Sequence, residues 1–302
     1  MASILVTGIA GMLGSNIAYL LRQRHTICGV DRNDVHIEGT HTVKDSVLNV
    51  ALLSNLIDEH NVDTLIHCAA IVNVDACEIH PDYAEIVNVI MTDNIAWLCR
   101  EKHVKMIYIS SDAVYSGEKE GLNSEDDVPA PISIYGKTKL AAEAVVLKRP
   151  GNLVLRTNMY GFNYREKLSF SEWLLKSLSE GAELNMFYDI LFSPLLVNHL
   201  VDVLEQCINK DLTGLYNAGC TGAISKYDLG VAFSKAFHLP NEIKRGSMKD
   251  FQFKAPRTKN MGLDNTKLKQ ALGIELQTPL EEVEAFRALY EQGYGERLKS
   301  GK

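Results

Sequence analysis

The sequence predicts an α/β fold in which a doubly wound parallel sheet carries a smaller C-terminal lobe. Two observations lead to this prediction. Short apolar runs rich in β-preferring residues alternate with segments of helical periodicity as far as Tyr160, and this rhythm is lost beyond it. Alternating strands and helices form a parallel sheet covered on both faces. We therefore expect a first domain over residues 1–160, a smaller lobe over 161–302, and a strand at 214–218 that returns to the main sheet.

The chain begins with a strand, a glycine turn and a helix. The apolar run Ile4–Val6 stops before Gly8, and helical spacing of apolar residues follows Gly14. With Gly11 between them, the glycines read G-x-x-G-x-x-G. Glycines at such a turn permit a positive φ, a close approach of the backbone to a pyrophosphate, and tight packing of the helix on the strand. This pattern predicts a Rossmann-type dinucleotide site rather than a glycine turn without a ligand.

The second strand ends at a residue that bears on the cofactor. Asp31 closes the run Ile27–Val30, near the distance at which an acidic residue accepts the ribose hydroxyls of a dinucleotide. A carboxylate there repels a 2′-phosphate, so we expect NAD(H) to be favoured. Arg32 follows directly and could pair with that phosphate, so NADP(H) remains open.

The remaining elements follow in order. After Asp31 we expect a polar connection through His41 and then a helix over 49–60. The strand at 64–68 is closed by Ala69 and Ala70, whose small side chains leave room for a cofactor. Further segments have the patterns of helices at 81–89, 93–102 and 135–147 and of strands at 105–109 and 152–155. In the second half, helices are expected at 170–178, 195–208, 225–236 and 278–290, followed by a frayed polar tail after Gly293.

Three residues at one end of the predicted sheet could carry chemistry. Ser111 ends the strand that begins at Lys105, on the side where open α/β sheets bind ligands. Tyr135 and Lys139 are four residues apart and therefore share one face of a helix. We expect the ammonium to lower the pKa of the phenol, so that Tyr135 exchanges a proton with a substrate oxygen held by Ser111. On an ordinary helix such a pair would mean little, but here it follows a dinucleotide turn.

Composition excludes several classes of function. The 302 residues carry a formal net charge of −7, which argues against nucleic acid or an anionic membrane as the main partner. No apolar stretch is long enough to cross a bilayer and no signal segment is evident, so we expect a cytoplasmic protein. The six cysteines are scattered without a C-x-x-C pair, and the nine histidines are dispersed, so we expect no metal site.

These motifs resemble a known family. The glycine motif with Tyr135-x-x-x-Lys139 resembles the extended short-chain dehydrogenase/reductases, and finer matches are similar to dTDP-4-dehydrorhamnose reductases. Those matches are Ala69–Glu78, Ser110–Tyr115, Tyr135–Glu143, Leu155–Thr157, Tyr160–Gly161, Pro256–Arg257 and Leu263–Asp264. Val72, Ser111 and Ala113 depart from the family pattern, where threonine, threonine and tyrosine are usual, as do segments 189–194 and 257–258.

The resemblance implies roles for individual residues. Ser111, Tyr135 and Lys139 would be the catalytic triad, with Tyr135 protonating a carbonyl oxygen and Lys139 binding the nicotinamide ribose. The residues implied to bind the cofactor are Gly8, Gly11, Met12, Leu13, Gly14, Asp31, Arg32, Ala69, Ala70, Tyr135 and Lys139. The residues implied to bind substrate are Val72, Asn73, Ser111, Asp112, Tyr135 and Arg257.

Three functions are compatible with the resemblance. The leading one is an NAD(P)H-dependent reductase of a 4-keto-6-deoxy nucleotide sugar, in the synthesis of a deoxysugar for surface polysaccharide. The second is an epimerase or dehydratase of nucleotide sugars, although Asp112 is followed by Ala113 and thus lacks a neighbouring acid. The third is a non-catalytic regulatory subunit, like the β subunit of methionine adenosyltransferase. A homodimer and a monomer both fit the family.

Overall fold

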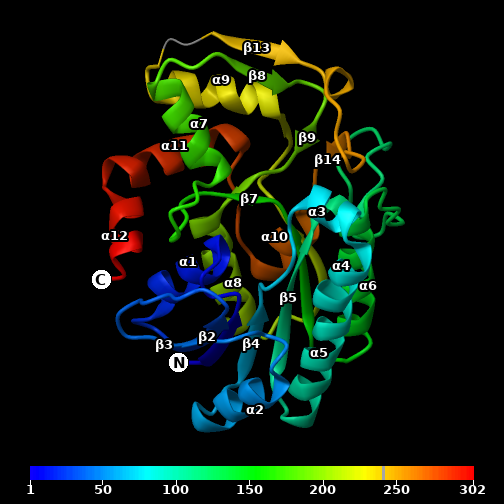
Figure 1. The fold of residues 1–302 in the computed structure, drawn as a ribbon, viewed down its shortest axis with the longest axis vertical. Helices are drawn as coiled ribbons and strands as arrows, with labels where there is room; N and C mark the ends of the chain where they lie inside the picture. Colours follow the sequence, from blue (N-terminus) through cyan, green and yellow to red (C-terminus); the bar gives the residue numbers. More distant parts are fainter. Residues whose placement is uncertain (240–241) are drawn as a thin grey trace.

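The computed structural model describes residues 1–239 and 242–302, and its centre is a seven-stranded sheet (Figure 1). The strand order is β11-β6-β5-β4-β1-β2-β3, and every neighbouring pair is parallel. The strands are β1 Ser3–Thr7, β2 Thr26–Asp31, β3 His41–Lys44, β4 Thr64–His67, β5 Lys105–Ser111, β6 Leu153–Thr157 and β11 Gly214–Ala218. The doubly wound fold is confirmed, and the strand expected at 214–218 forms the edge of this sheet.

Helices cover both faces of the sheet. One face packs against α1 Met12–Leu21, α8 Val197–Asn209 and α10 Thr266–Leu272. The other packs against α2 Val50–Glu59, α5 Met91–Glu101 and α6 Ile134–Leu147. Central strands such as β1 and β4 are buried along almost their whole length because helices lie on both sides. Helix α8 and strand β11 belong to this layer even though they follow residue 160.

The helical region before β5 differs from the expectation. Instead of two separate helices over 81–89 and 93–102, α4 Pro81–Glu85 continues through a π-helical turn, Ile86–Ile90, into α5. Asn88 lies buried in this wider turn. Its side chain hydrogen-bonds to the Ile71 backbone and to the Thr138 hydroxyl, contacts that the turn accommodates. The short helix α3, Val74–Ile79, precedes α4.

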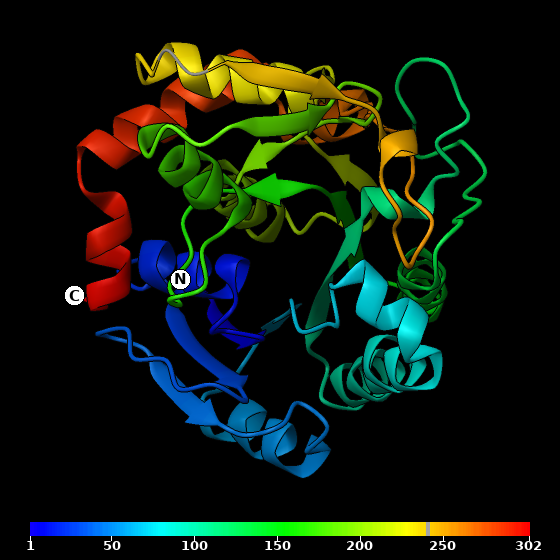
Figure 2. The same ribbon diagram turned by 45° about the horizontal axis from the view of Figure 1, so that its top comes forward.

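The second lobe has an aromatic core. Its helices are α7 Phe170–Ser179, α9 Lys226–Ala236, α11 Pro279–Glu291 and α12 Tyr294–Ser300. Its short strands are β7 Met159–Tyr160, β8 Leu184–Phe187, β9 Leu191–Phe192, β10 Leu195–Leu196, β12 Ile224–Ser225, β13 Ile243–Gly246 and β14 Asn260–Met261. Phe162, Phe233 and Phe286 are buried together, with the Phe162 and Phe286 rings stacked at 4.4 Å. Figure 2 shows this lobe above the end of the sheet.

One further expectation was wrong, and one strand was missed. The tail after Gly293 is not frayed but forms α12, because Tyr294 and Leu298 lie one turn apart and both pack into the second-lobe core. The Tyr294 hydroxyl also donates to Asn16 of α1 at 2.7 Å, which attaches the end of the chain to its beginning (Figure 1). The polar connection after Asp31 leads into strand β3, which the sequence interpretation missed and whose burial pattern is that of an edge. No helix in residues 1–239 and 242–302 is both long and apolar enough to span a bilayer.

Candidate active site

A cavity of about 890 Å³ lies where the strands of the main sheet end and the second lobe begins. Its wall includes residues that follow β1, β2, β4, β5 and β6, together with residues of α6, α7, β8 and α9. Ligands of open α/β sheets bind beyond the carboxyl ends of the strands. The volume is near the upper end of the range for small-molecule sites, roughly 300–1,000 Å³, and can accommodate two ligands side by side.

The glycine turn has the geometry of a phosphate site. Gly8 has a φ of +75° and donates its N–H to the Val30 carbonyl at 2.9 Å. A Cβ on Gly14 would lie 2.3 Å from the Gly8 carbonyl oxygen, so only glycine lets α1 pack this closely on the turn. Gly11 caps α1 without a side-chain hydrogen bond. The first amides of α1 therefore remain free to bind an anion at the positive end of the helix dipole.

Asp31 lies on the same wall with its carboxylate held in place. One oxygen accepts the Ala10 N–H at 3.2 Å, and the other accepts the backbone and side-chain N–H groups of Asn33 at 2.9 and 2.8 Å. These donors fix the carboxylate against the glycine turn while leaving lone pairs for ribose hydroxyls. The neighbouring Arg32 guanidinium contacts the Tyr83 hydroxyl at 3.4 Å and also lines the cavity.

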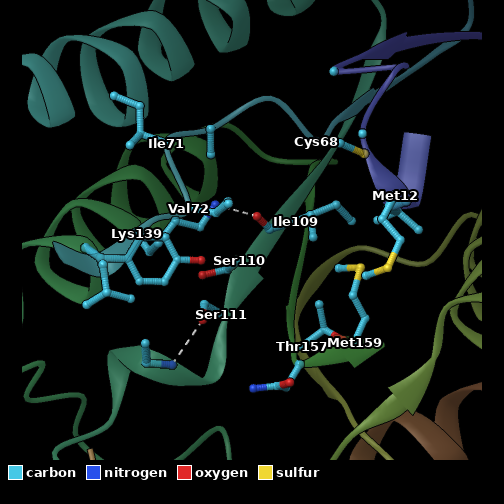
Figure 3. Close-up of a pocket in the computed structure, with 18 of the residues that line it drawn as sticks. Met12, Cys68, Ile71, Val72, Ile109, Ser110, Ser111, Lys139, Thr157 and Met159 are labelled. Carbon is cyan, nitrogen blue, oxygen red and sulfur yellow. Dashed lines mark hydrogen bonds between the residues drawn. The ribbon is translucent and has the colours of Figure 1, made fainter. Parts of the chain in front are cut away.

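The expected triad gathers at the other end of the cavity. Ser111 ends β5, and Tyr135 and Lys139 lie one turn apart on α6. In Figure 3, Lys139 donates a hydrogen bond to the Ile109 carbonyl, at 2.6 Å, and the Ser111 hydroxyl accepts one from the Ala113 N–H, at 3.2 Å. The Lys139 ammonium also lies 4.3 Å from the centre of the Tyr108 ring. Lys139 thus keeps a fixed position beside the strand that carries Ser111.

The protonation states differ from the expectation. Burial raises the pKa of Tyr135 to about 12, and its interaction with the Ser111 hydroxyl offsets this only in part. The expected lowering of this pKa was wrong, because Lys139 is directed to the Ile109 carbonyl and burial dominates. Burial lowers the pKa of Lys139 to about 8, opposed by the Glu143 carboxylate. Tyr135 is therefore a neutral phenol that can donate a proton.

Asp112 adds a buried carboxyl group next to Ser111. It is 3% exposed, accepts the Ser111 hydroxyl at 3.0 Å, and accepts the Asn158 amide at 2.6 Å. Burial raises the pKa of Asp112 from 3.8 to about 6, against the opposing effect of its hydrogen bonds. Asp112 is thus harder to ionise in the folded protein than in the unfolded chain.

This shift predicts a pH-dependent effect of Asp112→Asn on stability. Because the folded-state pKa of Asp112 is raised, its protonated form favours the fold below about pH 4. This contribution to the free energy of unfolding is lost as the pH rises through about 6. The free energy of unfolding of the variant, minus that of wild type, should therefore increase between pH 4 and 7, by up to about 3 kcal/mol. Urea unfolding at pH 4, 5.5 and 7 measures it, with exposed Asp34→Asn as control. Parallel pH profiles for wild type and Asp112→Asn would contradict the prediction.

Arg257 reaches the cavity from the second lobe. Its Nη2 donates to the Asp75 carboxylate at 2.7 Å, whereas its Nη1 is buried without a hydrogen-bond partner among the described residues. A buried guanidinium nitrogen without a partner is costly unless a ligand accepts its hydrogen bond. A substrate phosphate would satisfy it, and Arg165 lines the same cavity.

The structure brings nearly all the sequence-predicted site residues to this one cavity wall. Those lining it are Gly8, Gly11, Met12, Leu13, Gly14, Asp31, Arg32, Ala69, Ala70, Val72, Ser111, Asp112, Tyr135, Lys139 and Arg257. Asn73 is the exception, since its side chain accepts the Ala76 N–H at 2.9 Å as the N-cap of α3. The sequence interpretation missed Asn158, Arg165, Phe187, Lys226 and Phe253, which also line the cavity.

Comparison with known proteins identifies the family. Residues 1–291 match the family model described as the RmlD substrate binding domain. The chain belongs to this family. The resemblance to dTDP-4-dehydrorhamnose reductases expected from the motifs is thereby confirmed. Proteins named as dTDP-4-dehydrorhamnose reductases are among its relatives.

Two curated relatives differ in what their names describe. The "Probable low-salt glycan biosynthesis reductase Agl14" of Haloferax volcanii is 27% identical over 291 residues, which cover 94% of this chain and 97% of the relative. Methionine adenosyltransferase 2 subunit beta of Xenopus laevis is 30% identical over 298 residues, covering 91% of this chain and 84% of the relative. The RmlD-family relatives therefore include both a reductase and a subunit of another enzyme.

Two solved structures resemble the RmlD-family chain over nearly its whole length. A dTDP-4-dehydrorhamnose reductase from Clostridium acetobutylicum has 26% identity and a TM-score of 0.85, covering 96% of this chain and 99% of that one. MoeE5, solved in complex with UDP-glucuronic acid and NAD, has 25% identity and a TM-score of 0.81, with 97% and 99% covered. MoeE5, a protein of similar shape, thus holds NAD and a nucleotide sugar together.

Proposed function

We propose that this protein reduces the ketone of a 4-keto-6-deoxy nucleotide sugar with NAD(P)H, in the cytoplasm, during synthesis of a deoxysugar for surface polysaccharide. One observation carries the proposal. Ser111, Tyr135 and Lys139 line the same cavity as the glycine turn and Asp31. A dinucleotide bound on the turn with its ribose near Asp31 would extend toward the triad.

Each triad residue has a separate task in this proposal. The nicotinamide supplies a hydride to the carbonyl carbon of the sugar. Tyr135, kept neutral by burial, donates its phenolic proton to the carbonyl oxygen. Ser111 holds that oxygen in line, and Lys139 orients the cofactor ribose from its position beside Ile109.

The second lobe would hold the nucleotide part of the substrate. Arg257 carries a buried Nη1 that has no partner in the part of the chain that the structure describes, and Arg165 lines the same cavity, so both can bind the diphosphate. Phe187 and Phe253 also line the cavity, with their rings 5.8 Å apart. Such rings offer flat faces on which a base can stack. We propose that residues 1–160 bind the cofactor and that the lobe within 161–302 binds the nucleotide sugar.

Consumption of NADH and NADPH tests the proposal directly. The protein would be supplied with 4-keto-6-deoxy sugars linked to dTDP, GDP or UDP, with Tyr135→Phe measured beside wild type. Steady consumption with at least one sugar, lost in the variant, is expected. Cofactor binding without consumption of any sugar would contradict a reductase.

A regulatory subunit is the second candidate, because the methionine adenosyltransferase β subunit is as similar to this chain as the reductases are. The chain would then bind a dinucleotide without turnover and alter the activity of a partner enzyme. Failure to reduce any sugar, together with a change in methionine adenosyltransferase activity when this chain is added, would favour it.

Substitutions at the end of β2 test the cofactor preference, for which we propose NAD(H) over NADP(H). Asp31→Ala is expected to lower kcat/KM for NADH by about 10-fold, since one charge-assisted hydrogen bond to the ribose is worth roughly 1.5 kcal/mol. Arg32→Ala serves as the matched control and should affect NADPH more than NADH. Steady-state kinetics with both cofactors measure the two effects. A larger loss for NADPH than for NADH in Asp31→Ala would contradict this assignment.

A further inference from the structure

Lys226 is a second ammonium at the triad end of the cavity. It is the first residue of α9, and its side chain lines the cavity wall together with Ser111 and Asp112. Its Nζ lies 3.5 Å from the centre of the Phe192 ring and 4.7 Å from that of Phe170. The two rings fix the ammonium by cation–π contact, but a ring face accepts no directed hydrogen bond of the kind an oxygen does.

Neither helix stability nor an ion pair explains this lysine. A cation in the first turn of a helix is unfavourable, because the helix dipole is positive there. No carboxylate of residues 1–239 and 242–302 lies within 4.0 Å of Nζ. Burial lowers the pKa of Lys226 to about 8, and Asp112 acts in the opposite direction. The side chain is half-buried and its ammonium keeps N–H donors available to a molecule in the cavity.

Asp112 is the negative counterpart of this ammonium. Asp112 and Lys226 line the same cavity, more than 4.0 Å apart, and each favours the charged form of the other. The Asp112 carboxylate also accepts the Ser111 hydroxyl. Asp112 thus lies next to Ser111, which would hold the carbonyl oxygen in the proposed reaction, and Lys226 lines the same cavity.

We propose that Asp112 and Lys226 together bind the sugar hydroxyl on the carbon next to the ketone, so that Lys226 makes the pocket specific for an α-hydroxy ketone. A hydroxyl can donate to the carboxylate and accept from the ammonium at once, whereas a hydrogen in its place does neither. The inference rests on the proposed function for the identity of the ketone.

Turnover of a matched substrate pair tests this specificity. The pair is a 4-keto-6-deoxy sugar and its analogue without the 3-hydroxyl, in the nucleotide form that supports turnover. Wild type should prefer the hydroxylated sugar by roughly 10- to 100-fold in kcat/KM, as for a charge-assisted hydrogen bond. Lys226→Met should lose most of this preference. Its kcat/KM should fall for the hydroxylated sugar and stay unchanged for the analogue. Lys176→Met, on the exposed face of α7, should keep it. An unchanged preference in Lys226→Met would overturn the inference while the reductase proposal stands.

A binding measurement keeps the inference testable if no sugar is reduced. Brief acetylation of the full chain with acetic anhydride, followed by mass spectrometry, reports how accessible each lysine is. A mixture of dTDP-glucose, UDP-glucose and GDP-mannose should slow acetylation of Lys226 at least several-fold relative to Lys176. The corresponding nucleoside diphosphates without sugar should not.

Three outcomes of the labelling would overturn the inference. They are equal labelling with and without nucleotide sugar, equal protection by the diphosphates alone, and no labelling of Lys226 in the free protein. The last counts because the ammonium must be open to the cavity. If the nucleotide sugars protect Lys226 from acetylation but no 4-keto-6-deoxy sugar is reduced, the reductase proposal is refuted. The role of Lys226 in sugar binding then remains.

Discussion

Replacing Tyr135 with phenylalanine is expected to lower kcat by about 10²- to 10⁴-fold, the usual contribution of a positioned general acid. The change removes one oxygen and leaves the ring in its place on α6. Burial keeps the phenol protonated, with a pKa of about 12, so the proton that the carbonyl oxygen needs is present throughout the neutral range. Steady-state kinetics with the sugar that wild type reduces measure the loss.

Cofactor binding separates this effect from misfolding. NAD(P)H contacts are expected mainly at the glycine turn and Asp31, so its dissociation constant in Tyr135→Phe should stay within about threefold of wild type. Tyr290→Phe is the control, since Tyr290 is an exposed tyrosine of α11 outside the cavity. A Tyr135→Phe variant that retains more than about one tenth of the wild-type kcat would exclude Tyr135 as the acid.

The sequence predicts the strand, the glycine turn and the place of Asp31 well because these signals are local. Gly8, Gly14 and Asp31 belong to one strand–turn–helix–strand unit, where short-range sterics determine the backbone. The spacing of Tyr135 and Lys139 likewise needs only a helix. The position of Ser111 next to them follows once the order of the parallel strands is known. The resemblance to the family implies that order.

Several cavity residues, among them Asn158 and Lys226, escaped prediction because distant segments of the chain bring them together. Lys226 reaches the cavity through the packing of α9 on the second lobe, and Asn158 meets Asp112 across two strand ends. Neither residue belongs to a motif that the sequence displays. The one available signal was the lysine directly after the N-cap Ser225, a position that the helix dipole disfavours.

Tertiary contacts also explain the wrong prediction of the Tyr135 pKa and the failure to predict α12 and β3. Proximity of Lys139 in sequence gave no indication that its ammonium would be used by the Ile109 carbonyl. Helix α12 forms on a polar sequence because Tyr294 and Leu298 pack against the rest of the lobe. Strand β3 forms because β2 offers an edge with which it can pair. In each case a tertiary contact outweighed the local pattern.

A buried ion pair behind the triad gives the largest expected effect on stability. Glu143 and Arg156 are 1% and 2% exposed, and Arg156 binds both carboxylate oxygens, with Nη2 at 2.7 Å. Glu143 also accepts the Ser110 hydroxyl at 2.5 Å, while Arg156 donates to the Tyr115 hydroxyl at 2.8 Å. The pair thus joins α6, which carries Tyr135 and Lys139, to β6 through Arg156 and to β5 through Ser110.

Glu143→Gln is expected to lower the free energy of unfolding by about 3–5 kcal/mol, because it leaves the guanidinium buried without a counter-charge. Denaturant unfolding at neutral pH measures the loss. Glu284→Gln on α11, which breaks an exposed pair with Arg287, is the control and should cost less than about 1 kcal/mol. Removing both charges in Glu143→Leu/Arg156→Met should cost less than Glu143→Gln alone, since no unpaired charge then remains. If the double variant were the less stable one, the hydrogen bonds to Ser110 and Tyr115, rather than the charge pairing, would be what holds α6 against β5 and β6.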